Sequence, residues 1–156
     1  MNTQRYTDKV KQVLQAAQSD ALVRGHTQLT PWHVLAQALA DSAGLAENLI
    51  AAAGGDAVRL KNECGTALSK MATQQGGEAQ LTLATETAKI FALAEQHADK
   101  AGDAFVTQER LLAALVAGKS DTAKAVAACG VTPDALTAAI TDLRQGRRAD
   151  SVSAEE

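Results

Sequence analysis

Aromatic residues and prolines are scarce in this 156-residue chain. Phe, Trp and Tyr together make up 3% of it, and there are two prolines. Sheets are built from aromatic and β-branched side chains, whereas alanine-rich segments without proline favour helices. The composition therefore predicts a helical protein. A chain of this length can bury a substantial core, either as one domain or as two small halves that share it.

Long apolar runs and an excess of positive charge are missing as well. No apolar stretch approaches the ~18 residues that suggest a membrane-spanning helix, and the first residues are too polar for a secretory signal. The formal net charge is -3, which argues against nucleic-acid binding because that requires a basic surface to replace phosphate counterions. We therefore expect a cytoplasmic protein that binds neither a membrane nor nucleic acid.

Metal-binding side chains do not occur at ligand spacing. The two cysteines, Cys64 and Cys129, fall on apolar helical stripes, so we expect them to pack as small buried side chains in a reducing compartment. His26 and His33 are seven residues apart, but a predicted helix start separates them and no Cys or carboxylate cluster completes a set. We expect structural or solvated roles for these histidines and for His97, and neither a metal nor a cofactor.

The chain contains an internal repeat. The segment 25–31, GHTQLTP, precedes an apolar run, and 77 residues later the segment 102–108, GDAFVTQ, precedes another. Farther along the offset falls to 76, where Ala53-Gly54 aligns with Cys129-Gly130. Two copies are too few for a solenoid. They predict one globular domain with a pseudo-twofold axis and a groove where the halves meet.

Helix starts can be placed from capping residues. Threonine precedes proline at both prolines of the chain, and this pair starts a helix with a capping side chain and a proline at the first position. Together with the spacing of the apolar residues, these signals predict an all-α fold of about eight helices in two tandem four-helix repeats. The expected capping residues are Thr7, Thr30, Asp56, Thr82, Thr107, Ser120 and Thr132.

The same signals predict the domain organisation. One domain is expected over residues 1–145, with repeat one at 1–72 and repeat two at 82–145. The polar, glycine-containing segment 73–81 has the composition of a linker between the repeats. The charged stretch 146–156 is expected to be a flexible tail or the start of a linker.

The end of the second repeat combines an apolar face with a basic run. The last predicted helix places Leu136, Ile140 and Leu143 on its inward face. A short run of positive charge follows, which we interpret as solvated and which consists of Arg144, Arg147 and Arg148.

One stretch is similar to a phosphate-binding loop. Residues 113–120, AALVAGKS, fit a loosened form of the motif, but its mechanism requires a glycine-rich loop between a strand and a helix. Here an apolar helical stripe precedes the glycine. We interpret Gly118 as the end of one helix and Ser120 as the cap of the next. No nucleophile motif or carboxylate pair is visible either, so we expect no catalytic residues.

The two repeats differ at two acidic positions. Asp103 occupies the place of His26, and Glu109 occupies the place of Trp32. Glu109 lies in the first turn of a helix, where a negative charge interacts favourably with the helix dipole and stabilises the helix by ~0.3–1 kcal/mol. Asp103 can close an Asx-type turn. Both residues can therefore be structural. An acidic pair in one copy alone is equally compatible with a binding site.

Several of these segments together resemble one family. They are Thr7 with the apolar stripe after it, the GHxxLTP segment at 25–31, the GDxFVTxExLL segment that begins at Gly102, and the ending Leu143-Arg144-Gln145-Gly146. Nearly the whole chain is similar to the Clp N-terminal domain, the double helical repeat at the start of large AAA+ unfoldases. Within this family, the GDxFV form and the closing LRxG are most similar to the ClpB disaggregase branch.

This resemblance implies a non-catalytic binding domain on a hexameric, ATP-driven machine. Such domains bind unfolded or aggregated polypeptide and pass it to the ATPase rings of the same parent chain. The isolated domain is expected to be monomeric. The positions that match the family's substrate surface are Thr7, Asp103 and Glu109 on a polar rim, with Val13 and Phe91 in an apolar groove.

Two departures from the family pattern bear on that surface. Arg110 stands where an apolar or histidine residue is usual and is expected to narrow the groove, so we count it among the substrate contacts. Trp32 replaces a glutamate after Thr-Pro, which argues against a phosphoarginine-type site in the first copy. Two other classes stay open: a docking domain for an adaptor protein, as in the ClpA and ClpC branches, and an enzyme without a visible site.

Overall fold

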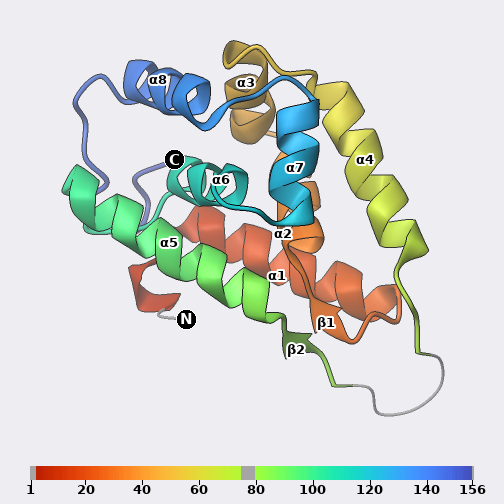
Figure 1. The fold of residues 1–156 in the computed structure, drawn as a ribbon. Coiled ribbons are helices and arrows are strands. Elements are labelled where there is room, and N and C mark those ends of the chain that lie inside the picture. Colours follow the sequence, from red (N-terminus) through yellow and green to blue (C-terminus); the bar gives the residue numbers. More distant parts are fainter. Residues whose placement is uncertain (1–2, 75–79, 156) are drawn as a thin grey trace.

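The computed structural model describes residues 3–74 and 80–155, and regular structure in these residues is almost entirely helical (Figure 1). Residues 75–79 of the linker expected at 73–81 lie outside the described residues. The described part contains a 3-10 helix, two short strands and eight α-helices. Their bounds are η1 Thr3–Arg5, α1 Asp8–Val23, β1 Gln28–Leu29, α2 Pro31–Ala40, α3 Leu45–Ala52, α4 Ala57–Lys70, β2 Thr82–Leu83, α5 Thr85–Ala101, α6 Gln108–Val116, α7 Asp121–Ala128 and α8 Pro133–Arg144.

Short polar side chains start most of the helices, as the sequence predicts. The Thr7 hydroxyl accepts a hydrogen bond from the Val10 N–H at 3.3 Å, which satisfies one of the amides that have no partner at a helix start. Both prolines lie in the first turn of a helix. The same kind of side-chain cap is formed by Asp56, Thr107, Ser120 and Thr132.

One predicted cap is wrong. Thr82 lies in β2, and α5 begins three residues later, after Ala84. The Thr82 N–H donates to the Thr27 carbonyl at 3.0 Å. The extended backbone that this contact requires places Thr82 outside the helix.

The two repeats are related by a pseudo-twofold arrangement. Leu29 of β1 pairs in parallel with Leu83 of β2, and an isolated parallel bridge joins Tyr6 to Val106. Adding 77 residues to Leu29 gives Val106, and subtracting 77 from Leu83 gives Tyr6. Each repeat therefore contributes the same two segments to its partner, and the repeat offset found in the sequence is a symmetry of the fold.

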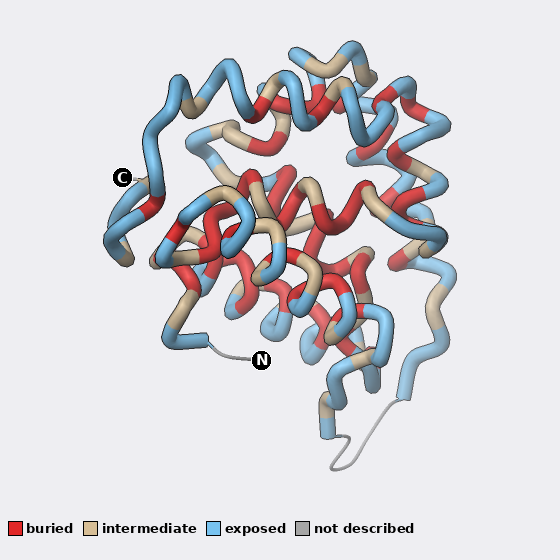
Figure 2. Tube along the Cα trace, turned by 60° about the vertical axis from the view of Figure 1, so that its left-hand side comes forward, coloured by how far each residue is buried: buried red, intermediate tan, exposed pale blue. Residues whose placement is uncertain are grey.

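Helix α6 lies at the centre of the molecule. It packs against α1, α2, α3, α5, α7 and α8, and seven of its nine residues are buried. The buried stretches converge there, while the outer faces of the surrounding helices are exposed (Figure 2). The polar first turn of α6 is consequently buried, and its charged side chains need partners within the protein.

The stretch that is similar to a phosphate loop joins two helices, as the sequence indicates. Helix α6 ends at Val116, Gly118 has a left-handed φ of 90°, and the Ser120 hydroxyl accepts the Ala123 N–H at 3.0 Å. The element directly before the loop is helix α6 and not a strand. The backbone therefore lacks the strand–loop–helix arrangement that wraps a phosphate.

Residues 147–155, called here the C-terminal segment, pack on the second repeat and on the start of α1. The Ala149 carbonyl accepts the Ala104 and Phe105 N–H groups at 2.9 and 3.1 Å, and the Val152 carbonyl accepts the Asp8 N–H at 2.8 Å. In Figure 1 the end of the chain lies beside α6. Loop and helix-start amides require acceptors, and this segment supplies them.

Candidate functional site

Four of the six residues expected to contact substrate meet in one place. Thr7, Asp103 and Glu109 are buried, with 0%, 4% and 3% of their surface exposed, and Arg110 is half-buried beside them. They come from the start of α1, the loop after α5 and the first turn of α6. We call the whole group the polar cluster, which consists of Thr7, Asp103, Thr107, Glu109, Arg110, Arg144 and Glu155.

Asp103 is fully satisfied by partners inside the protein. Its Oδ1 accepts hydrogen bonds from the Arg144 guanidinium and, at 2.9 Å, from the Ala149 N–H. Its Oδ2 accepts from the Arg110 Nε at 3.2 Å. The carboxylate thus connects α6, α8 and the C-terminal segment, and its side chain is not exposed on a rim.

Arg144 joins the two acidic residues of the second repeat. One of its terminal nitrogens contacts Asp103, and the other lies 2.5 Å from Glu109 Oε1. Burial acts to lower the pKa of Arg144, but the hydrogen bonds and charges of Glu109 and Asp103 outweigh it and raise that pKa. The two carboxylates, Asp103 and Glu109, thus face the two guanidinium groups of Arg110 and Arg144. The positive and negative charges in this part of the cluster are therefore equal in number.

The inward position of Arg144 corrects the interpretation of the basic run. Leu143, expected on the apolar face of the last helix, is 39% exposed. Arg144 takes the inward place four residues after Ile140, and its side chain is 11% exposed. The spacing of four from Ile140 is the signal that could have identified it, since residues four apart share one face of a helix.

The first repeat has a different pair at the equivalent positions. His26 and His33, which correspond to Asp103 and Arg110 at the 77-residue offset, are buried and joined by a 2.7 Å hydrogen bond between His26 Nδ1 and His33 Nε2. The Thr30 N–H donates to His33 Nδ1 at 2.9 Å. His33 Nδ1 is therefore an acceptor, and Nε2 carries the proton that His33 donates to His26. The pair has a structural role, as the sequence suggests.

The histidine pair should make the domain sensitive to acid. Burial, together with the adjacent His26, lowers the pKa of His33 from 6.5 to about 4. Between these values the unfolded chain binds more protons than the folded one, so stability falls as the pH decreases through this window. The loss should reach about 3 kcal/mol near pH 4. Urea unfolding at pH 7 and pH 4.5 measures it.

The matched variant for this prediction is His33→Asn, whose side-chain oxygen can still accept the Thr30 N–H but whose amide does not titrate. We expect its free energy of unfolding to depend less on pH than that of the wild type. If the two proteins lose the same stability between pH 7 and pH 4.5, the histidine pair is not the source of the acid sensitivity.

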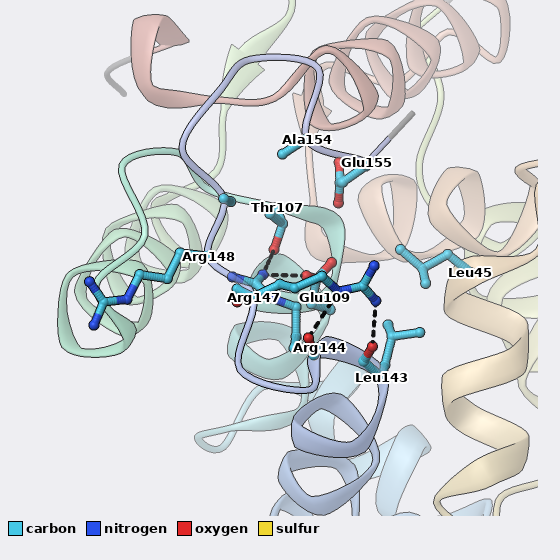
Figure 3. Close-up of a pocket in the computed structure, with 10 residues that line it drawn as sticks. Leu45, Thr107, Glu109, Leu143, Arg144, Arg147, Arg148, Ala154 and Glu155 are labelled. Carbon is cyan, nitrogen blue, oxygen red and sulfur yellow. Dashed lines mark hydrogen bonds and ion pairs between the residues drawn. The ribbon is translucent and has the colours of Figure 1, made fainter.

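A cleft of about 320 Å³ opens beside the polar cluster (Figure 3). The Thr107, Glu109 and Arg144 side chains form its polar wall, Leu45 of α3 lies opposite, and Arg148 points away. The cleft is lined by Leu45, Thr107, Glu109, Leu143, Arg144, Arg147, Arg148, Ala149, Ala154 and Glu155.

Glu155 connects the cleft to the starts of α1 and α6. Its Oε2 lies 2.5 Å from the Thr7 hydroxyl, and its Oε1 accepts the N–H of Gln108. Gln108 is the first residue of α6, so its N–H has no partner within the helix. No local sequence pattern indicates this contact, because Glu155 is 148 residues from Thr7.

The structure separates Val13 and Phe91, which we expected in a single groove. Val13 borders a groove of about 280 Å³ between α1 and α2. The equivalent groove of about 300 Å³ in the second repeat is bordered by Ile90, which aligns with Val13 at the 77-residue offset. Phe91 is 1% exposed and packs on Tyr6, with ring centroids 5.3 Å apart. Ile90, and not Phe91, presents an apolar side chain to the second groove.

Two features are absent from the part of the chain that the structure describes. No three His, Cys, Asp or Glu side chains gather there as metal ligands would. Its helices include none with the length and apolar composition needed to cross a membrane.

Known proteins share both the sequence and the fold. The Clp repeat (R) N-terminal domain family matches residues 5–126. The chaperone protein ClpB of Mesorhizobium japonicum is 48% identical over 157 residues, and that of Brucella suis is 47% identical over 156 residues. These alignments cover 100% and 99% of this chain but only 18% of each relative, so the chain spans about a fifth of their length.

The fold likeness extends to a more distant protein. The Hsp104 N-terminal domain from Candida albicans has a TM-score of 0.85 to this structure at 20% identity, with 97% of this chain and 99% of that chain covered. The family match covers well over half of the chain, and the ClpB relatives align along nearly all of it. The chain therefore belongs to the Clp repeat N-terminal domain family and is similar to the N-terminal part of ClpB chaperones.

Proposed function

We propose that this domain recruits unfolded or aggregated polypeptide for a ClpB-type disaggregase in the cytoplasm. The 48% identity to a ClpB chaperone carries the proposal. In it, the domain is a monomeric, non-catalytic module, and the hexameric ATPase rings that receive the polypeptide belong to the same parent chain. A co-chaperone or adaptor can be a further partner.

The cleft beside the polar cluster is the proposed polar contact site. The Thr7 hydroxyl and the Gln108 N–H both donate to the carboxyl group of Glu155, which lines the cleft. In its absence both can donate equally well to the carbonyl groups of a client chain. Asp103, Glu109 and Arg110 have an indirect role in this proposal, because they hold one another and Arg144 in place. Such contacts to many different clients are necessarily modest in strength, at ~1 kcal/mol each.

The two equivalent grooves are the proposed apolar contact sites. Val13 borders one and Ile90 the other. Each groove combines apolar side chains with polar ones at its border. The apolar part attracts exposed apolar side chains without directional requirements, which suits a domain that must bind many sequences. The pseudo-twofold arrangement presents two such grooves to one client chain.

The substitution Thr7→Ala tests the polar contact site. In a Glu155→Ala background, where no carboxyl group accepts from the Thr7 hydroxyl, we expect it to weaken binding of a permanently unfolded client, reduced and carboxymethylated α-lactalbumin, by roughly fivefold, which corresponds to the loss of one hydrogen bond of ~1 kcal/mol. Fluorescence anisotropy with labelled client measures the affinity. Amide chemical shifts of the domain should change around the cleft and the two grooves when the client is added.

Thr132→Ala is the matched control for Thr7→Ala. Thr132 caps α8 by the same kind of hydrogen bond, from the Ala135 N–H at 3.1 Å, and its side chain lies outside the polar cluster. Both variants lose a helix cap, so both should lose similar stability, but only Thr7→Ala should lose affinity. Equal affinities in the two variants would contradict the site, and binding of a folded adaptor but not of an unfolded chain would contradict the function.

A further inference from the structure

We propose that the C-terminal segment occupies the polar contact site of its own domain and competes there with client polypeptide. The proposal rests on the function proposed above and describes the regulation of the same site. In this arrangement the domain has a closed state, in which Glu155 fills the site, and an open state, in which a client takes its place.

Residues 152–155 form a turn whose oxygen atoms accept hydrogen bonds from donors that a client chain could also use. The Val152 carbonyl accepts the Asp8 N–H at 2.8 Å, and three residues later the Glu155 carboxyl group contacts the Thr7 hydroxyl and the Gln108 N–H. The three donors are the Asp8 N–H, the Thr7 hydroxyl and the Gln108 N–H, and all lie at helix starts. Backbone N–H groups at a helix start lack partners within the helix. A client that uses any of these donors must displace the segment.

The closed state is held by few contacts. Ala149 is buried, whereas residues 150–155 are exposed or only half-buried. The segment beyond Ala149 therefore buries little apolar surface, and its attachment depends on the hydrogen bonds of Val152 and Glu155. Segments with few buried apolar contacts open at low free-energy cost, so a client of modest affinity can replace this one.

The charge around Glu155 favours the closed state at low pH. Burial raises the pKa of Glu155 to about 7; its hydrogen bonds to Thr7 and Gln108 act in the opposite direction, and Glu109 adds to the increase. The other charged groups of the cleft are Arg144, which is paired with Glu109, and Arg147 and Arg148. Because the docked carboxyl group binds its proton more tightly than a free glutamate, docking weakens as the pH rises through 7.

The test compares Glu155→Ala with Asp150→Ala in this chain. Both replace an acidic side chain of the segment with alanine, but Asp150 is exposed. Anisotropy with labelled, reduced and carboxymethylated α-lactalbumin at pH 6.5 should show about tenfold tighter binding to Glu155→Ala and unchanged binding to Asp150→Ala. Raising the pH to 8 should tighten binding to the wild type and narrow its difference from Glu155→Ala.

Hydrogen exchange gives a readout that does not depend on a client. The Gln108 amide donates to Glu155, so it should exchange faster in Glu155→Ala than in the wild type or in Asp150→Ala. Equal client affinities in the three proteins overturn the competition and leave the proposed function standing. If no protein binds the client while the Gln108 amide still reports docking, the proposed function fails.

Discussion

Replacing Arg144 with methionine is expected to lower the free energy of unfolding by about 3–5 kcal/mol, because it leaves two buried carboxylates without their shared partner. The Asp103 side chain is 0% exposed and that of Glu109 is 4% exposed, so hydration compensates little for the lost guanidinium. Urea unfolding followed by circular dichroism measures the change. Arg148→Met is the control, since Arg148 is exposed and points away from the cluster, and it should change stability by less than about 1 kcal/mol.

A triple variant separates the loss of charge pairing from the loss of packing. Asp103→Asn and Glu109→Gln, added to Arg144→Met, remove both carboxylate charges while keeping the side-chain sizes similar. Arg110 then loses its ion pair with Asp103, but its side chain is 19% exposed and keeps access to water. We expect the triple variant to be more stable than Arg144→Met alone, because neutral amides cost less to bury than unpaired carboxylates. A triple variant less stable than Arg144→Met would mean that packing, and not charge, accounts for the effect.

Replacing Phe91 with alanine is expected to lower the free energy of unfolding by about 3–5 kcal/mol through the cavity that it leaves. Phe91 is 1% exposed and packs against Tyr6, which is itself fully buried, where the two repeats meet. The control is Leu83→Ala, because Leu83 is 37% exposed and should lose about 1 kcal/mol or less. Chemical unfolding of the three proteins measures the differences.

The burial of Phe91 also decides which residue should be substituted to test client binding in the groove. A polar residue at position 91 would destabilise the core, so any loss of client binding could reflect unfolding. Ile90 borders the groove and is 8% exposed, which makes Ile90→Ala the better probe of groove binding. If Phe91→Ala keeps the wild-type stability, Phe91 is not part of the core and can contact a client directly.

The sequence by itself determined the helices, their starts and their duplication. Capping hydrogen bonds such as that of Thr7 to the Val10 N–H join residues three apart, so the local sequence specifies them. The 77-residue offset likewise reappears in the pairing of Leu29 with Leu83 and of Tyr6 with Val106. The prediction that Thr82 caps a helix is wrong because its conformation depends on a contact with Thr27, 55 residues away, and not on the local sequence.

Only the tertiary structure decided which polar side chains meet and which are buried. Thr7, Asp103 and Glu109 carry no sequence signal of burial, because short-range spacing describes one helix face and not what covers it. They are buried because α6 lies among six other helices and because Arg144, 41 residues from Asp103, reaches both acids. Glu155 joins them from 148 residues beyond Thr7. Charge pairing across such separations depends on where the packed helices bring their ends together, which no local pattern records.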